Sequence, residues 1–209
     1  MLKKISWLLL ASTLFLTACS SEAESVQSEV QSAYATKEEL VVSLNEIQTK
    51  EAQIQADFDE AIAADEELVN FKDGSASVFA NIESREEALE SVQSAVTSLQ
   101  EEAEKLQGFE EETLPIEAIH AFAATINEIN SIVTDYAASY EEQLEQEKQI
   151  FESFGSEEAD FDTLYDGVET LNGTSDANLS QIQPLIDLLA AFDTQETELV
   201  SELTALQEQ

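Results

Sequence analysis

Apolar residues recur at alternating spacings of four and three along most of this chain, and this periodicity restricts its possible folds more than any other feature. Between residues 26 and 68 the pattern passes through thirteen positions without a slip, and ten of them are apolar. The positions are Val26, Val30, Ala33, Lys37, Leu40, Leu44, Ile47, Glu51, Ile54, Phe58, Ala61, Asp65 and Leu68. Such a repeat is typical of helices that pack along a shared hydrophobic seam, and not of β-strands. It predicts one continuous helix from about residue 22 to 70, ended by a turn at Asp73-Gly74.

Two further seams follow and predict two more long helices. The second consists of Val78, Ile82, Arg85, Leu89, Val92, Val96, Leu99, Ala103 and Leu106. The third consists of Ile119, Phe122, Ile126, Ile129, Val133, Tyr136, Tyr140, Gln143, Glu147, Ile150 and Phe154. Gly108 and Gly155 follow the two seams directly, where glycine commonly ends a helix. Pro115 precedes the third seam, at a position that favours the first helical turn.

The last quarter of the chain is less regular. Its apolar positions are Phe161, Tyr165, Val168, Leu179, Ile182, Ile186, Leu189, Val200 and Leu203. The polar run 172–176 interrupts the pattern, which then resumes in the same register. Pro184 lacks a backbone donor, so it predicts either a kink or the true start of a helix. We expect a helix broken into two pieces, at about 157–171 and 176–207, with a new N-terminus at Ser156.

Together these patterns predict an all-α fold. Short connections make successive helices antiparallel, so we expect an elongated up-and-down bundle of four helices, the last one broken, with coiled-coil-like packing. A three-helix arrangement, with the second and third segments docked differently on the first, is the alternative. One helical-bundle domain, residues 19–209, then accounts for the chain after its N-terminal segment, and residues of about 19–25 are expected to form a tether.

The first eighteen residues have the organisation of a bacterial signal peptide. Lys3 and Lys4 precede an apolar run that is too short to span a bilayer as a helix. The run ends in Leu16-Thr17-Ala18-Cys19, which resembles the lipobox of bacterial lipoproteins, and Cys19 is the only cysteine of the chain. This resemblance implies removal of residues 1–18 and attachment of lipid to Cys19, including fatty acids such as palmitate. It predicts anchoring at the cell membrane, on the extracytoplasmic face, where two or more acyl chains suffice.

The charge of the chain excludes several classes of partner. The formal net charge is −37, and it becomes −39 once Lys3 and Lys4 leave with the signal peptide. Nucleic acids and anionic lipid surfaces are bound through Lys and Arg, so we expect no nucleic-acid partner and anchoring by lipid alone. Weak, delocalised binding of divalent cations is compatible with so many carboxylates.

No catalytic residue, cofactor site or metal site is predicted. His120 is the only histidine and has only Glu117 one turn away as a neighbour of suitable chemistry. The acidic clusters around Asp57, Glu102, Glu111 and Asp162 follow no known metal-binding spacing. With 45 acidic residues, close pairs of carboxylates arise by chance, so we interpret them as solvated helix faces.

Several charged residues occupy seam positions, among them Lys37, Glu51, Asp65 and Arg85. A buried charge is costly unless it is paired, so we predict that some of them pair across helices and fix the helix register, for instance Arg85 with Glu51 or Asp65. The alternative is that they lie at the edge of the seam and extend into solvent.

The aromatic residues after the signal peptide are four Tyr and nine Phe, without Trp. Most of them lie on the seams, where heptad spacing is typical of core packing. The sequence therefore predicts no exposed aromatic platform for a sugar ring.

The lipobox, the long acidic heptad-patterned helices and the stretch Phe161-Asp-Thr-Leu-Tyr-Asp-Gly-Val-Glu-Thr-Leu-Asn172 occur in this order. This combination resembles the YkyA-type cell-wall-binding lipoproteins of Gram-positive bacteria. The resemblance implies a non-enzymatic helical bundle on the outer face of the membrane that binds the cell wall or another envelope component. The alternative is a protein-interaction module, such as a tethered helical spacer, adaptor or holdase.

Overall fold

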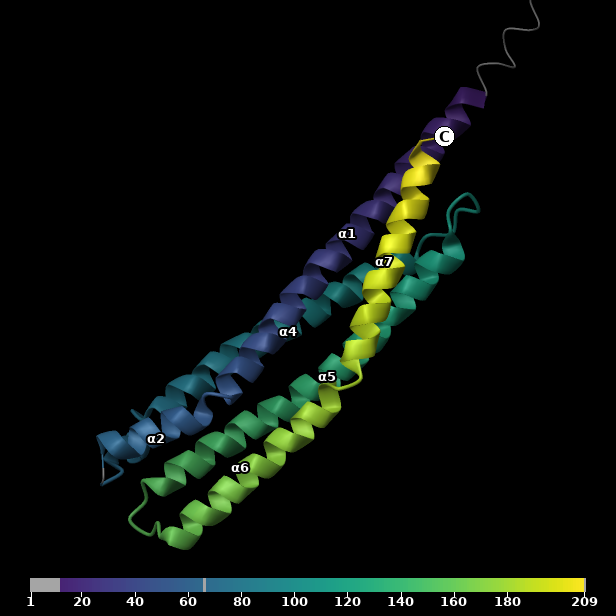
Figure 1. The fold of residues 1–209 in the computed structure, drawn as a ribbon. Coiled ribbons are helices and arrows are strands. Elements are labelled where there is room, and N and C mark those ends of the chain that lie inside the picture. The colour runs from purple at the N-terminus through teal and green to yellow at the C-terminus, as the bar shows by residue number, and fades with distance from the viewer. Residues whose placement is uncertain (1–11, 66, 209) are drawn as a thin grey trace, which may run out of the picture. The chain divides into compact units, whose positions relative to one another are not determined.

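The computed structural model of the chain describes the backbone of residues 12–65 and 67–208. Side chains are described from Glu22 to Glu208, except at positions 66 and 176. The described residues form seven α-helices and contain no β-strand (Figure 1), which confirms the all-α prediction. The helices are α1 (Ser12–Glu51), α2 (Ile54–Ala64), α3 (Val69–Lys72), α4 (Ser77–Gln107), α5 (Ile116–Phe154), α6 (Phe161–Ile182) and α7 (Leu185–Gln207).

These helices form two compact units. Unit 1 combines the chain up to Lys37 with Thr97–Asn130 and Ile186–Gln209, and unit 2 combines Glu38–Val96 with Ser131–Leu185. Three long helices, α1, α4 and α5, contribute to both units, whereas α7 belongs almost entirely to unit 1 and α2, α3 and α6 to unit 2. Unit 1 therefore contains lengths of α1, α4, α5 and α7, whereas unit 2 contains lengths of α1, α4 and α5 together with α2, α3 and α6, so the number of helices differs from the four predicted.

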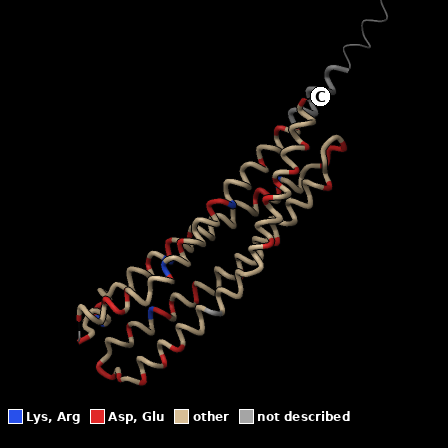
Figure 2. The backbone as a smooth tube through the Cα atoms, viewed as in Figure 1, with Lys and Arg blue, Asp and Glu red and all other residues tan. Residues whose placement is uncertain are grey.

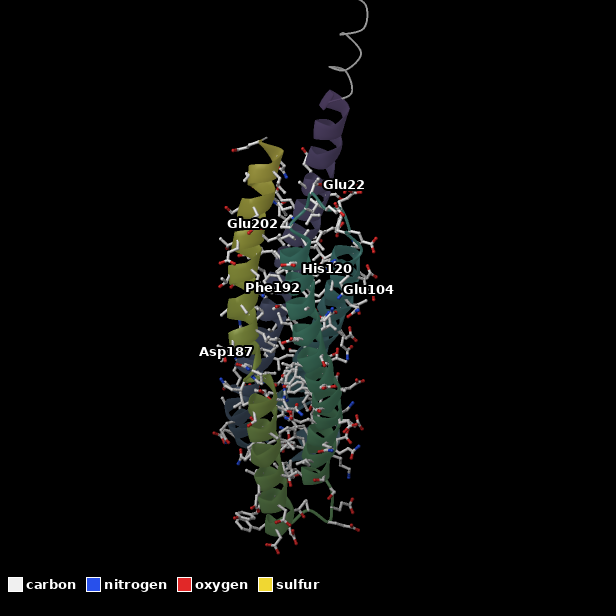
Figure 3. The ribbon with its side chains drawn as sticks, turned by 90° about the vertical axis from the view of Figure 1, so that its right-hand side faces the viewer. Glu22, Glu104, His120, Asp187, Phe192 and Glu202 are labelled. Atoms are coloured by element: carbon white, nitrogen blue, oxygen red, sulfur yellow. The ribbon has the colours of Figure 1, made fainter. Side chains whose placement is uncertain are left out.

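The neighbouring helices of unit 1 are antiparallel. Gln207 donates to Gln27 at one end of the α1–α7 pair, and Lys37 pairs with Asp193 further along it. The rings of Phe122 on α5 and Phe192 on α7 lie 4.7 Å apart between centroids. Figure 3 labels Phe192 on α7. The first three seams supply the core here: their apolar side chains from Val26 to Ala33, from Leu99 to Leu106 and from Ile119 to Ile129 are buried.

Unit 2 has an aromatic core at one end. Phe58 of α2, Phe71 of α3, Phe79 of α4 and Phe151 and Phe154 of α5 pack with centroid separations of 5.8–6.5 Å. Edge-to-face pairs of this kind add to the stabilisation from buried area. Burial of Phe71 in this cluster holds the short helix α3 against α5.

The predicted continuous helix from residue 22 to 70 is wrong in its last third. The helix ends at Glu51, resumes as α2 at Ile54, and stops again at Ala64. Asp65, predicted as a seam position, instead accepts hydrogen bonds from the backbone N–H groups of Glu67 (3.1 Å) and Asn70 (3.0 Å). Asn70 in turn donates to the Ala61 carbonyl at the end of α2, 2.8 Å away. Side chains that satisfy free backbone groups in this way favour a helix end over a continuous helix.

The predicted break in the last helix also lies at a different place. The run 172–176 lies inside α6, and the break falls at Gln183-Pro184, between α6 and α7. Proline cannot donate the helical hydrogen bond and its ring clashes with the preceding turn, so its effect outweighs that of Gly173. The start of α6 is also later than expected. Asp160, not Ser156, is the N-cap, and its side chain accepts the Thr163 N–H at 2.9 Å in a capping box.

Residues 19–25, expected to form a tether, lie within helix α1, and Ala23 is buried. The lipobox residues Leu16, Thr17, Ala18 and Cys19 also lie in α1, but their side chains are outside the described residues, as is most of the predicted signal peptide. Among the described residues, no helix combines the length and the apolar character that a membrane crossing requires.

Candidate functional site

A buried ion pair lies in the core of unit 2. Arg85 is 1% exposed and pairs with Glu147 of α5 through both guanidinium Nη atoms. Arg85 Nη1 also donates to the Tyr140 hydroxyl at 3.1 Å, and Nε donates to Asn81 Oδ1 at 2.9 Å. The predicted pairing of Arg85 with Asp65 is therefore wrong. Its contacts satisfy the guanidinium internally and leave it without access to a ligand.

Glu51 lies close to this ion pair. Burial raises the pKa of its carboxyl, against the lowering effect of the Arg85 charge and of a hydrogen bond from Tyr140. Glu51 Oε1 is buried without a hydrogen-bond partner. Burial likewise raises the pKa of the Tyr136 and Tyr140 hydroxyls. The cluster thus places two carboxylates and one cation in the core of unit 2, where it joins residues of α1, α4 and α5.

Unit 1 contains two buried charged residues. Lys37, on the α1 seam, extends its ammonium group to Asp193 of α7 at 2.8 Å and lies over the Tyr34 ring. Glu102 of α4 accepts hydrogen bonds from the hydroxyls of Ser32 at 2.6 Å and Thr36 at 3.0 Å. Both residues connect α1 to a neighbouring helix, so these contacts also serve packing.

The burial of Glu102 leads to a testable dependence on pH. Desolvation raises the pKa of this carboxyl, against the hydrogen bonds from Ser32 and Thr36, which lower it. A carboxyl whose pKa is higher in the folded state stabilises the fold fully when the pH lies below its unfolded-state pKa. This contribution is lost as the pH rises through the folded-state pKa. We therefore expect Glu102→Gln to flatten the pH dependence of the melting temperature and to raise that temperature at neutral pH.

The measurement is thermal unfolding by circular dichroism between about pH 4 and pH 8. This range begins near the ordinary glutamate pKa and extends above it. Glu104→Gln is the matched control, because Glu104 is an exposed residue of the same helix (Figure 3) and its replacement changes the net charge equally. Identical pH profiles for the two variants would show that the Glu102 carboxylate carries no burial penalty.

His120 lies on the surface of unit 1 (Figure 3), where its Nε2 is 3.2 Å from the carbonyl oxygen of Phe109. This contact joins the start of α5 to the loop before it. Acidic residues are spread along the helices of both units, as Figure 2 shows. Over the described part of the chain, no group of three or more His, Cys, Asp or Glu side chains is placed to hold a metal ion.

One face of α6 carries exposed apolar side chains that take no part in the packing of unit 2. Phe161, Tyr165, Val168 and Leu179 project into solvent, with exposed fractions of 78%, 60%, 36% and 48%. At about 100° per residue these positions fall within roughly 60° of one another around the helix. We call these four residues the α6 apolar face. Their assignment to the core, which the heptad spacing predicted, is wrong.

A different face of α6 packs against α5, the neighbouring helix in Figure 1. Gly167 approaches so closely that a Cβ there would lie 2.8 Å from Phe154 and 2.9 Å from Ile150. Asn178 is buried and donates to Gln143. Because a glycine and an amide make these contacts, the packing face is less hydrophobic in sequence than the face that remains exposed.

Sequence reasoning missed the exposed face for this reason. The signals that could have revealed it are the polar interruption of the stripe at Asn172 and the alternative stripe formed by Leu164, Leu171 and Ile182. The two stripes compete for burial, and the close approach at Gly167 decides between them.

A family model described as "YkyA: Putative cell-wall binding lipoprotein" matches residues 21–202 of the chain, which confirms the resemblance inferred from the sequence. The matched range includes the whole of unit 2, with all of α6, and the part of unit 1 that lies between residues 21 and 202. No curated protein and no solved structure matches the chain.

Proposed function

Because this chain belongs to the YkyA family, described as putative cell-wall binding lipoproteins, we propose that it binds the cell wall, is anchored to the membrane and catalyses no reaction. The anchor is lipid on Cys19, at the end of the lipobox that begins at Leu16. Two or more acyl chains on that residue are sufficient for stable attachment. The helical domain then lies on the extracytoplasmic face of the cell membrane.

The α6 apolar face is the observation that supports wall binding most directly. Exposed apolar patches on soluble domains commonly mark interaction sites. Two of its four side chains, those of Phe161 and Tyr165, are aromatic and largely exposed. Aromatic rings of this kind can stack on the C–H faces of sugar rings, which are the main repeating unit of a bacterial wall.

Co-sedimentation with isolated cell-wall sacculi tests this function. The protein is the unlipidated mature chain, residues 19–209 with Cys19→Ser, and the sacculi are used with and without their anionic polymers. We expect saturable pelleting with the bare glycan at physiological salt, where screening over about 8 Å weakens repulsion by the acidic surface. Absence of pelleting under all conditions, including added Ca²⁺, would contradict wall binding.

A groove in unit 2 favours a second candidate function, a protein-interaction module. The groove lies between α4 and α5, has a volume of about 890 Å³ and is lined by apolar and acidic side chains. The lining residues include Leu89, Leu144, Glu86, Glu90, Glu141 and Glu145. Such a groove suits a basic segment of another envelope protein. A crosslinking group placed at Glu90 or Glu141 of the membrane-anchored protein would identify that partner in vivo.

A further inference from the structure

Going one step beyond wall binding, and resting on that proposed function, we propose that the α6 apolar face binds the uncharged carbohydrate backbone of a glycan. Phe161 and Tyr165 stack on successive sugar rings, and neighbouring polar side chains of α6 accept hydrogen bonds from the sugar. The face selects against anionic phosphate polymers. The ligand class is a strand of N-acetylated amino sugars.

The two aromatic residues are neighbours on one face of the helix, which suits an extended ligand. Phe161 and Tyr165 are four residues apart on one helix, so their side chains are neighbours whose Cβ atoms lie roughly 6 Å apart. An extended chain of linked sugar rings can therefore contact both aromatic side chains at once. The capping box at Asp160 and Thr163 fixes Phe161 as the first residue of α6 and holds both rings on the same side of a regular helix.

Polar groups flank the rings where a sugar needs them. Asp162 and Glu169 lie one turn before and one turn after Tyr165 on the same side of α6, and both are exposed. Asn172 is exposed and lies on the stripe itself, between Val168 and Leu179. Carboxylate and amide oxygens accept hydrogen bonds from sugar hydroxyls and from the N–H of an acetamido group.

The charge of α6 excludes a polyanionic ligand. The helix carries Asp162, Asp166, Glu169 and Asp176 and contains no Lys or Arg. Binding of phosphate polymers depends on neutralisation by basic side chains, which this helix lacks. A second copy of the chain is disfavoured for the same reason, because two such faces would bring like charges together. An uncharged glycan meets no such repulsion.

The experiment measures binding of two soluble probes to the unlipidated mature chain by NMR titration. The probes are an N-acetylglucosamine tetramer, which is uncharged, and a polyglycerol phosphate, which is anionic. We expect the tetramer to shift the backbone amide signals of α6 in a saturable way and the anionic polymer to shift none of them.

Variants then assign binding to the rings. Phe161→Ala/Tyr165→Ala should weaken tetramer binding at least about tenfold, which corresponds to roughly 1.4 kcal/mol. Tyr165→Phe should retain binding, because stacking needs only the ring. Val42→Ala is the matched control, since Val42 is an apolar residue of unit 2 that is 65% exposed on another helix. It should bind like the unmodified chain, and circular dichroism should show equal helix content for every variant.

Each contrary result has a separate meaning. Failure of the chain to bind the tetramer, or equal binding by the double variant, would overturn the α6 glycan site. If the double variant still pellets with sacculi, wall binding stands and only this location fails. If the unmodified chain pellets with no sacculi, the proposed function itself fails. Concentration-dependent self-association that the double variant abolishes would replace the glycan site by an interface between copies.

Discussion

Replacement of Arg85 by leucine is expected to lower the free energy of unfolding by roughly 3–5 kcal/mol, among the largest effects of any single substitution in this chain. Among the described residues, Arg85 is the cation that pairs with Glu147, whose side chain is 7% exposed. Leucine would leave Glu147 buried without its charge partner. It would also remove the positive charge that lowers the pKa of Glu51.

The expected loss depends on pH. In the Arg85→Leu variant Glu51 loses the neighbouring positive charge that lowers its pKa, so burial is expected to raise the folded-state pKa of its carboxyl further. Such a group binds protons more tightly in the folded state, and the stability it contributes is therefore lost as the pH rises. The deficit of the variant should be largest at neutral pH and smaller in mild acid, as measured by urea unfolding at several pH values.

A double variant shows how much of the destabilisation comes from leaving Glu147 without its charge partner and how much comes from lost packing. Arg85→Leu/Glu147→Leu replaces both charges by apolar groups, and buried pairs replaced in this way are often neutral or stabilising. We expect it to recover most of the stability lost in Arg85→Leu. If both variants were as stable as the unmodified chain, the ion pair would have no role in holding the helices of unit 2 in register.

Gly155→Ala is expected to destabilise unit 2 by roughly 3 kcal/mol, at the upper end of the usual cost of overpacking. A Cβ at Gly155 would lie 2.3 Å from the Lys72 backbone nitrogen and 2.7 Å from its Cα. These are backbone atoms of α3, so no side-chain rotation can relieve the clash. Displacement of α3 would move Phe71 out of the aromatic cluster that it forms with Phe58 and Phe151.

Gly173→Ala is the matched control for this prediction. Gly173 lies inside α6, and a Cβ there would meet nothing within 4 Å. Alanine in a helix interior is favoured over glycine by about 0.5–1 kcal/mol, so this variant should be slightly more stable than the unmodified chain. Chemical unfolding of both variants measures the contrast. Equal stability of Gly155→Ala and Gly173→Ala would contradict the close approach of α5 and α3.

Sequence periodicity predicted the first seam as far as Glu51, and the second and third seams, because each of these stretches has a single apolar stripe. Leu40, Leu99 and Ile126, for example, are all buried at predicted seam positions. A helix with one apolar face has only one way to remove it from water, so the pattern alone determines which residues form the core.

The partner of Arg85 and the exposed face of α6 could not be predicted in the same way. Choosing Glu147 among 45 acidic residues requires the register between α4 and α5, which periodicity leaves open. In α6 there are two apolar stripes, and the face that packs is the less hydrophobic of the two in sequence. A contact distant in sequence, Gly167 against Phe154 and Ile150, determines which of them is buried.

The composition of unit 1 affects the order in which the protein can fold during its synthesis. Gln27 and Gln207, which form a hydrogen bond in this unit, are 180 residues apart in the chain. Unit 2 contains only residues 38–185, so all of its helices are available while α7 is still being made. Contacts between distant residues also form more slowly than local ones. The N-terminal part of α1 therefore lacks its contacts with α7 until the last helix has been made, and unit 1 is completed last.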